Sequence, residues 1–207
     1  AEAAWDAGHF EAEVLPMSAE QCNARAGVEK DEGFRPGSSP ESLAKLRPAF
    51  TKEGSVTAGN ASQISAGAAA VVVMSLAKAK ELGLSPIAKI VDYNTAGVEP
   101  KKLFFAPAIG IEALLAKNDV KVDDIDLFEI NEAFAAQVLA DIKHLGVPED
   151  KLNICGGGIA LGHPIGASGT RVLVTLLHQL GRTGGKRGVA SLCLGGGNAV
   201  SMMVEMV

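Results

Sequence analysis

Hydrophobic and polar residues follow two recurring patterns along most of this chain. Short apolar runs, typical of buried strands, alternate with longer stretches whose apolar residues are three or four positions apart, as on one face of a helix. The strand-like runs are residues 67–74, 88–96, 127–130, 151–155, 188–194 and 199–205. The helix-like stretches are residues 76–82, 109–118, 132–145 and 167–180. This alternation predicts an α/β fold, with helices packed on a sheet.

Two of these assignments depend on local detail. The run GAAAVVVM at residues 67–74 has no periodicity, and its length and consecutive valines favour a buried strand over a helix. The last two runs are separated by the glycines at 195–197, which predict a tight turn and an antiparallel pair.

The first 55 residues differ from the rest. Residues 1–13 are charged and helix-like, residues 14–17 suit a short strand, and residues 33–42 (GFRPGSSPES) are rich in turn formers. The chain has no initiator Met and begins within the helix-like stretch, so we expect it to be cut from a longer protein. We interpret residues 1–55 as the remnant of a subdomain and its return segment, and residues 56–207 as the main domain.

Composition and charge exclude several classes of protein. The 47% hydrophobic content predicts a sizeable core, built from small aliphatic side chains because aromatic residues are only 4%. The net charge is −5 and no basic stripe is present, which argues against nucleic-acid binding. The longest apolar stretch, residues 66–74, is too short to span a membrane. Three widely spaced cysteines predict neither disulfides nor a metal site, and favour a reducing compartment such as the cytoplasm.

Glycines mark the regions where chemistry is expected, since 13 of the 24 lie in residues 156–197. The first candidate, however, is the turn NEAF at residues 131–134, between a strand-like run and a helix. An Asn at a helix start is most often an N-cap, and the tetrapeptide alone favours that role for Asn131. A neutral amide there can also fix a water molecule or donate to a developing oxyanion.

His163 is the second candidate. It lies between Gly162 and Pro164 in the loop CGGGIALGHPIGASG at residues 155–169. Free N–H groups at the start of the following helix favour negative charge beside it. The loop lacks the Lys that a phosphate-binding P-loop requires. This setting favours a functional histidine over a structural one.

Cys193 is the third candidate, at the end of an apolar run and next to the triple glycine. A buried Cys is commonly an inert small hydrophobe. A glycine turn beside it would instead expose the thiol and direct backbone N–H groups into the same space, which favours a reactive cysteine.

In this order and spacing, NEAF at 131–134, GGGIALGHPIGASG at 156–169 and CLGGG at 193–197 resemble the three C-terminal signature blocks of the thiolases. GNAS at 59–62 and GAAA at 67–70 resemble the family's entry into this domain. The resemblance implies the C-terminal half of a thiolase: an α/β domain with a mixed, mainly parallel sheet and helices on both faces, preceded by the tail of a loop subdomain.

The resemblance also implies roles for individual residues. His163 would help to activate an acyl-accepting cysteine and would donate to the thioester oxygen as it becomes an enolate, while Asn131 would hold the water that completes this oxyanion hole. Cys193 would be the acid/base cysteine. The backbone N–H of Gly195 would belong to a second oxyanion hole, which serves the acylated nucleophile.

The implied reaction is a reversible Claisen condensation of two acyl-CoA molecules, acetyl-CoA to acetoacetyl-CoA, or the thiolytic cleavage of a 3-ketoacyl-CoA. CoA or acyl-CoA is then a substrate, and no covalently bound cofactor or metal is expected. Positions that match the family's contacts to CoA are Ser62, Arg35, Phe50 and Ala58.

Two departures from the family pattern bear on the partners. No residue of this chain matches the motif of the family's nucleophilic cysteine, which lies in the N-terminal half, so we expect the chain to need that half and to be inactive alone. Cys155 stands where many members have Asn.

Thiolases are usually dimers or dimers of dimers, which implies a homodimer or homotetramer. A mitochondrial or peroxisomal location stays open beside the cytoplasmic one.

Three other interpretations remain. The chain could belong to a thiolase-fold protein that binds acyl-CoA or lipid without turnover, or it could act only as an assembly module. A ketoacyl synthase has a related architecture, but would carry His or Asn at the position of Cys193.

Overall fold

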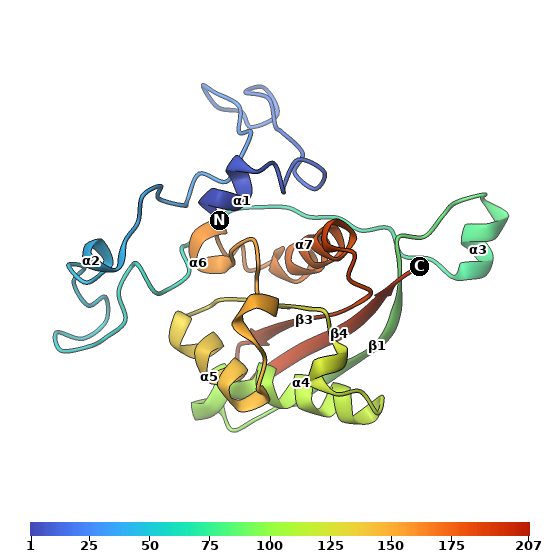
Figure 1. The fold of residues 1–207 in the computed structure, drawn as a ribbon. Coiled ribbons are helices and arrows are strands. Elements are labelled where there is room, and N and C mark those ends of the chain that lie inside the picture. Colours follow the sequence, from blue (N-terminus) through green and yellow to red (C-terminus); the bar gives the residue numbers. More distant parts are fainter.

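A four-stranded sheet of order β1-β4-β3-β2 forms the centre of the fold in the computed structural model, which describes residues 1–207 (Figure 1). The strands are β1 (Ala88–Gly97), β2 (Leu127–Ile130), β3 (Arg187–Leu194) and β4 (Asn198–Met206). The β2–β3 pair is parallel, whereas β3–β4 and β4–β1 are antiparallel. The sheet is mixed, as predicted, but only one of its three pairings is parallel, which corrects the expected mainly parallel arrangement. The tight turn after β3 forces β4 to run antiparallel to it.

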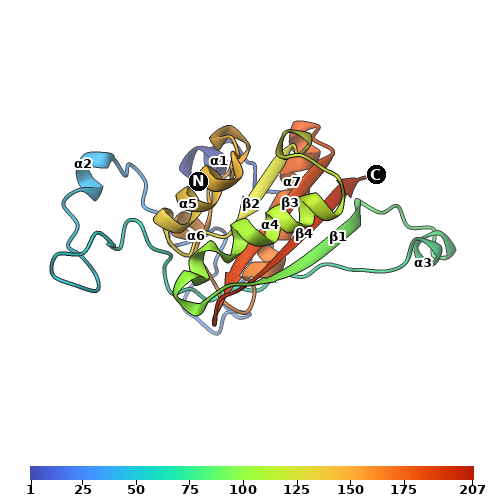
Figure 2. The same cartoon turned by 90° about the horizontal axis from the view of Figure 1, so that it is seen from below.

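Helices cover both faces of the sheet, as expected. α4 (Ala106–Lys117) and α5 (Ala135–Leu145) lie on one face, and α7 (Ser168–Thr183) lies on the other (Figures 1 and 2). Both α5 and α7 end at a glycine in the left-handed conformation, Gly146 and Gly184, each with φ of 73°. The shorter helices are α1 (Glu2–Asp6), α2 (Pro40–Leu43), α3 (Leu76–Glu81) and α6 (Gly158–Leu161), with 3-10 turns η1 (Pro100–Phe105), η2 (Val122–Asp124) and η3 (Glu149–Lys151).

The core has two layers because successive strand residues point to opposite faces. In β2, Phe128 and Ile130 pack against α4 and α5, whereas Leu127 packs against α7. The layer beside α4 and α5 also contains Ile111, Leu114, Val138, Val189 and Met203. The layer beside α7 contains Val172, Leu176, Leu180, Ala190 and Val204.

The run at residues 67–74 is not a strand, contrary to our prediction. It is extended but unpaired, and Val71, Val72 and Val73 are 40%, 87% and 67% exposed. Apolar residues with strand propensity form a strand only where a neighbouring strand accepts their backbone hydrogen bonds. No segment of this chain lies in that position.

Three smaller predictions need adjustment. The helix expected over residues 1–13 is only α1 followed by turns, and the strand at residues 14–17 is reduced to one bridge between Met17 and Val28. Residues 151–155 form an edge of one bridge, between Leu152 and Phe128.

The chain before residue 62 lies outside the sheet and adds no strand to it. Phe10 and Ala4 form a small buried cluster with Cys155, which attaches the N-terminal residues beside α6 and α7 (Figure 1). The loop that carries α2 extends away from the sheet. No helix of the chain has both the length and the apolarity that crossing a membrane requires.

Leu176 offers a test of the layer beside α7. Leu176→Ala should destabilise the chain by about 2–5 kcal/mol, because the lost methyl groups leave a cavity in a fully buried position. Leu139→Ala on α5 removes the same atoms from a side chain that is 56% exposed, and should change the unfolding free energy by about 0.5 kcal/mol or less. Urea unfolding followed by circular dichroism measures both, and equal effects would contradict this packing.

Candidate active site

Asn131 lies directly after β2 and its side chain is fully buried. Its backbone N–H donates to the carbonyl oxygen of Ser191 in β3 at 2.9 Å, which fixes its backbone to the end of the parallel pair. Its side-chain Nδ2 lies 3.3 Å from Nε2 of His163. The capping role is wrong, because α5 begins at Ala135 with Phe134 as the N-cap residue. The amide of Asn131 instead joins the sheet to the histidine loop.

His163 lies in the loop between α6 and α7 and is half-buried. Its Nδ1 is 2.6 Å from Oγ of Ser168, the first residue of α7. Burial, reinforced by the positive charge of Arg171, lowers the pKa of His163 below its usual value. The ring is therefore neutral near pH 7 and able to accept a proton.

Glu132 connects the NEAF turn to the glycines that precede His163. One carboxylate oxygen accepts from Nδ2 of Asn153 at 3.0 Å, and the other accepts from the backbone N–H of Ile159 at 3.2 Å. Gly157 approaches this carboxylate so closely that a Cβ at that position would overlap it. The side-chain length of Glu132 and the absence of a side chain at Gly157 therefore set the distance between the two segments.

A second buried chain of hydrogen bonds supports the same turn from α5. The backbone N–H of Ala133 donates to Oε1 of Gln137 at 3.2 Å, and Nε2 of Gln137 donates to Oδ2 of Asp141 at 2.7 Å. Gln137 and Asp141 are 4% and 0% exposed. Burial raises the pKa of Asp141 to about 7, and the Gln137 hydrogen bond opposes that rise.

Cys193 lies near the end of β3, two residues beyond Ser191, and is half-buried. Burial, with a further contribution from the negative charge of Asp141, raises the pKa of its thiol. Cys193 is therefore a thiol, not a thiolate, near pH 7. No hydrogen bond joins Cys193 to Asn131 or His163. Asn131 and His163 are in contact with each other, and Cys193 lies near the end of the strand that pairs with β2. Gly195 follows in an exposed turn.

Ser62 lies between the NEAF turn and the histidine loop. Its backbone N–H donates to the carbonyl oxygen of Ala133 at 2.9 Å. The next two residues contact α6 and the histidine loop. Nε2 of Gln63 donates to the Ala160 carbonyl oxygen at 3.1 Å, and Ile64 forms a backbone bridge to His163. The segment around Ser62 thus links both candidate motifs.

The other positions predicted to contact CoA are less firmly held. Phe50 is 73% exposed, and its ring lies edge-on to Phe134 with centroids 6.3 Å apart. Arg35 and Ala58 are exposed, and their side chains make no hydrogen bond to the candidate site.

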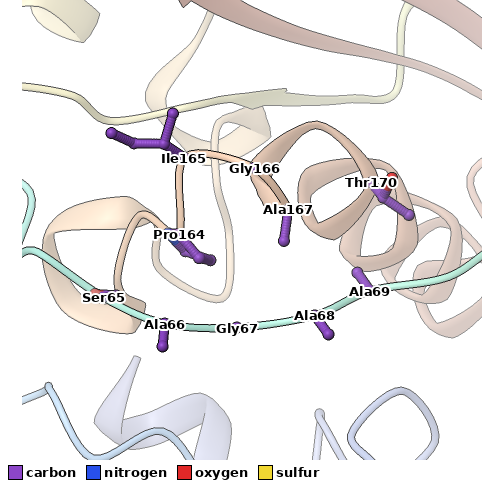
Figure 3. Close-up of a pocket in the computed structure, with 10 residues that line it drawn as sticks. All are labelled: Ser65, Ala66, Gly67, Ala68, Ala69, Pro164, Ile165, Gly166, Ala167 and Thr170. Atoms are coloured by element: carbon purple, nitrogen blue, oxygen red, sulfur yellow. The ribbon is translucent and has the colours of Figure 1, made fainter.

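An open cavity of about 460 Å³ is lined by the loop residues that follow His163, beginning at Pro164 (Figure 3). One wall is the extended segment 65–69 and the other is the start of α7 with the loop before it, and Figure 3 shows the two segments facing each other. The lining residues are Ser65, Ala66, Gly67, Ala68, Ala69, Pro164, Ile165, Gly166, Ala167 and Thr170. Small side chains dominate both walls.

Comparison with known families gives this geometry a context. The family model described as "Thiolase, C-terminal domain" matches residues 84–206, and the model described as "Thiolase, N-terminal domain" matches residues 1–77. The chain belongs to the thiolase family. The division that we place between residues 55 and 56 stays a prediction.

Curated thiolases and solved thiolase structures resemble the whole chain. It is 50% identical over 206 residues to the acetyl-CoA acetyltransferase of Cupriavidus necator, covering 99% of this chain and 52% of the relative. The crystal structure of the Bacillus anthracis acetyl-CoA acetyltransferase matches with a TM-score of 0.95 and 47% identity, over 100% of this chain and 52% of that one. Human mitochondrial 3-ketoacyl-CoA thiolase in complex with CoA matches with a TM-score of 0.90 and 37% identity, over 100% and 51%. The chain therefore spans about half the length of the thiolases that it matches.

Sequence reasoning missed the residues that hold this thiolase site together. Ser168, Gln137 and Asp141 are buried polar residues that contact His163 or the NEAF turn, directly or through one side chain. Gln137 and Asp141 are four residues apart on one helix, a spacing that places side chains together and could have signalled their contact. Ser168 carried no comparable signal.

Asp141 gives the site a testable pH dependence. Its folded pKa of about 7 lies above the ordinary value of 3.8, so the stability that its protonated form contributes is complete below pH 4 and is lost as pH rises through 7. Asp141→Asn removes this titration, and its unfolding free energy relative to the wild type should rise with pH between about 4 and 7. Urea unfolding at several pH values measures the difference, with the surface substitution Asp123→Asn as control. A constant difference between Asp141→Asn and the wild type would contradict the raised pKa.

Proposed function

We propose that this chain forms the C-terminal half of an acyl-CoA C-acyltransferase of the acetyl-CoA acetyltransferase type. The observation that carries the proposal is the contact between Nδ2 of Asn131 and Nε2 of His163, in the same loop as Pro164, which lines the open cavity. The names of the relatives from Cupriavidus necator and Bacillus anthracis support the same reaction class. In the synthetic direction, two acetyl-CoA molecules give acetoacetyl-CoA and free CoA. In the reverse direction, CoA cleaves a 3-ketoacyl-CoA.

The difficult step in synthesis is removal of a proton from the α-carbon of a thioester. This proton is weakly acidic, so its removal requires a positioned base and stabilisation of the enolate oxygen. His163, carrying a proton on Nε2 after it has activated the nucleophile, donates to that oxygen, and a water held by Asn131 donates beside it. The enolate carbon then attacks the acyl group of the acyl-enzyme. A carbon–carbon bond forms, and the thioester bond to the nucleophilic cysteine breaks.

Cys193 is the proposed base for the α-proton and, in the reverse direction, the acid that returns it. The raised pKa of its thiol keeps Cys193 protonated at rest. When the nucleophile is acylated, the Cys193 thiol gives its proton to the leaving CoA thiolate, and the Cys193 thiolate that remains is the base that takes the α-proton. The backbone N–H of Gly195 donates to the carbonyl oxygen of the acylated nucleophile.

The nucleophilic cysteine is proposed to come from the N-terminal half of the enzyme, because no residue of this chain matches its family motif. Ser62, Phe50, Ala58 and Arg35 are proposed to contact CoA, which is a substrate here.

The exposed valines at 71–73 are the proposed surface for the N-terminal half. A homodimer or homotetramer and a cytoplasmic location remain predictions, the latter resting on three free cysteines.

Cys193→Ala tests the acid/base assignment. In the chain assembled with the N-terminal half of the Cupriavidus necator enzyme, thiolysis of acetoacetyl-CoA should fall by about 10²–10⁴-fold, because the proton transfer loses its acid and base. Acylation of the nucleophile, measured by mass spectrometry after incubation with acetyl-CoA, should survive in part. The matched control is Cys22→Ala, another free cysteine, which should retain turnover. Full activity of the Cys193→Ala enzyme would remove this residue from the mechanism.

The need for a second half is tested separately. The purified 207-residue chain should show no thiolysis of acetoacetyl-CoA, and activity should appear when the N-terminal half is added. Turnover by the chain alone would contradict the proposed source of the nucleophile. An assembled protein that binds acetyl-CoA in calorimetry but never forms an acyl-enzyme would instead identify a binding protein of the same fold.

A further inference from the structure

Ser168 makes two hydrogen-bond contacts with a single hydroxyl proton. Its Oγ lies 2.9 Å from the carbonyl oxygen of Pro164 and 2.6 Å from Nδ1 of His163. The side chain is 0% exposed, so no solvent molecule replaces either partner. The Pro164 carbonyl oxygen also accepts from the backbone N–H groups of Ala167 and Ser168 at 2.8 Å. Because it can only accept, its contact with the serine oxygen is favourable only when the serine proton lies between the two oxygens. The contact with His163 then requires a proton from the ring.

We infer that the Ser168 hydroxyl holds neutral His163 in the tautomer that carries its proton on Nδ1, with the lone pair on Nε2. In this arrangement Nδ1–H donates to Ser168 Oγ, Ser168 Oγ–H donates to the Pro164 carbonyl oxygen, and Nδ2 of Asn131 donates to Nε2. Each of the three contacts then pairs one donor with one acceptor.

The opposite tautomer leaves a conflict at the other side of the ring. If Ser168 donated to Nδ1, Nε2 would carry the proton and would face the Nδ2 donor of Asn131 at 3.3 Å. Relief would require the Asn131 amide to rotate and present its oxygen. The two arrangements therefore place the ring proton on different nitrogens, and a measurement of that proton separates them.

The consequence for catalysis rests on the proposed function. A bare Nε2 can accept the thiol proton of the nucleophilic cysteine, which gives a thiolate and an imidazolium, and the same Nε2–H can then donate to the thioester oxygen. The Asn131 contact is longer than the usual 2.9–3.0 Å, which leaves the lone pair available to a stronger donor. Because burial and Arg171 lower the pKa of His163, the neutral form is the resting state. Ser168 is thus a positioning residue that acts through His163.

Nitrogen-15 NMR of the histidine-labelled chain reports the tautomer without any turnover. The chain has four histidines, and the signals of residue 163 are those that disappear in His163→Gln. Two-bond proton–nitrogen correlations at pH 8 should show the Nδ1–H pattern for His163 in the wild type. The Nε2–H pattern would overturn the inference, whichever variants fold.

Variants show whether the hydroxyl is the cause. Ser168→Ala should shift the tautomer ratio of His163 toward Nε2–H by about tenfold, the effect of one net hydrogen bond of about 1.4 kcal/mol. Ser168→Thr keeps the hydroxyl and should restore the Nδ1–H form. Ser201→Ala is the matched control, because it removes another fully buried hydroxyl, one that bonds the Ser191 hydroxyl and makes no hydrogen bond to His163. An unchanged tautomer in Ser168→Ala would contradict the assignment.

The assembled enzyme separates this inference from the proposed function. Ser168→Ala should slow acylation of the nucleophile by about tenfold or more and shift the pH profile of kcat/KM, with partial recovery in Ser168→Thr. If the assembled enzyme is inactive while the wild type shows Nδ1–H, the tautomer stands and the proposed function fails. If the enzyme is active with an Nε2–H histidine, the function stands and this inference fails.

Discussion

The site depends on how closely two loops can approach each other, and that distance is set by the carboxylate of Glu132 against Gly157. The carboxylate bonds Asn153 on one side and the Ile159 amide on the other, while the glycine leaves room for it. This approach brings the amide of Asn131 within reach of the ring of His163. A Cβ at position 157 would overlap the carboxylate of Glu132, so this side chain would have to move away from its present contacts with Asn153 and Ile159.

Titratable side chains are buried next to the candidate site, whereas the rest of the core is mainly apolar. Glu129 faces the α7 side of the sheet, is 2% exposed, and lies 3.8 Å from Nη1 of Arg171, too far for a hydrogen bond. Burial raises the pKa of Glu129 to about 8 and Arg171 opposes the rise. Burial likewise raises the pKa of Glu13 to about 7, and Arg171 again opposes it. Arg171 also lowers the pKa of His163, so one guanidinium acts on two carboxylates and on the imidazole. Titratable groups buried in this way are costly for stability and are concentrated where chemistry occurs.

Local patterns predicted most of the architecture because the relevant interactions are short in sequence. Residues 127–130 were predicted as β2 with its observed bounds, and the turn at 195–197 correctly indicated the antiparallel pair β3–β4. The run at 67–74 failed because a strand requires a partner, and pairing is a property of the assembly, not of the segment. In the site, the resemblance assigned Asn131 and His163 to one oxyanion hole but did not predict the direct contact of their side chains. Ser168 and Glu132 lie within the quoted motifs, yet their contacts were not predicted, because these depend on where loops distant in sequence meet.

The run that was wrongly predicted as a strand continues the segment that forms one wall of the open cavity. Residues 65–69 form one wall of the cavity (Figure 3). The exposed valines at 71–73 continue the same extended segment, which pairs with no strand. Apolar side chains exposed along an unpaired backbone are costly in water, so a surface that pairs with this segment would gain free energy from both the buried valines and the new hydrogen bonds. If such a surface also extended along residues 65–69, it would cover one wall of the cavity. The valines and the cavity wall would then be covered together, because both belong to one stretch of backbone.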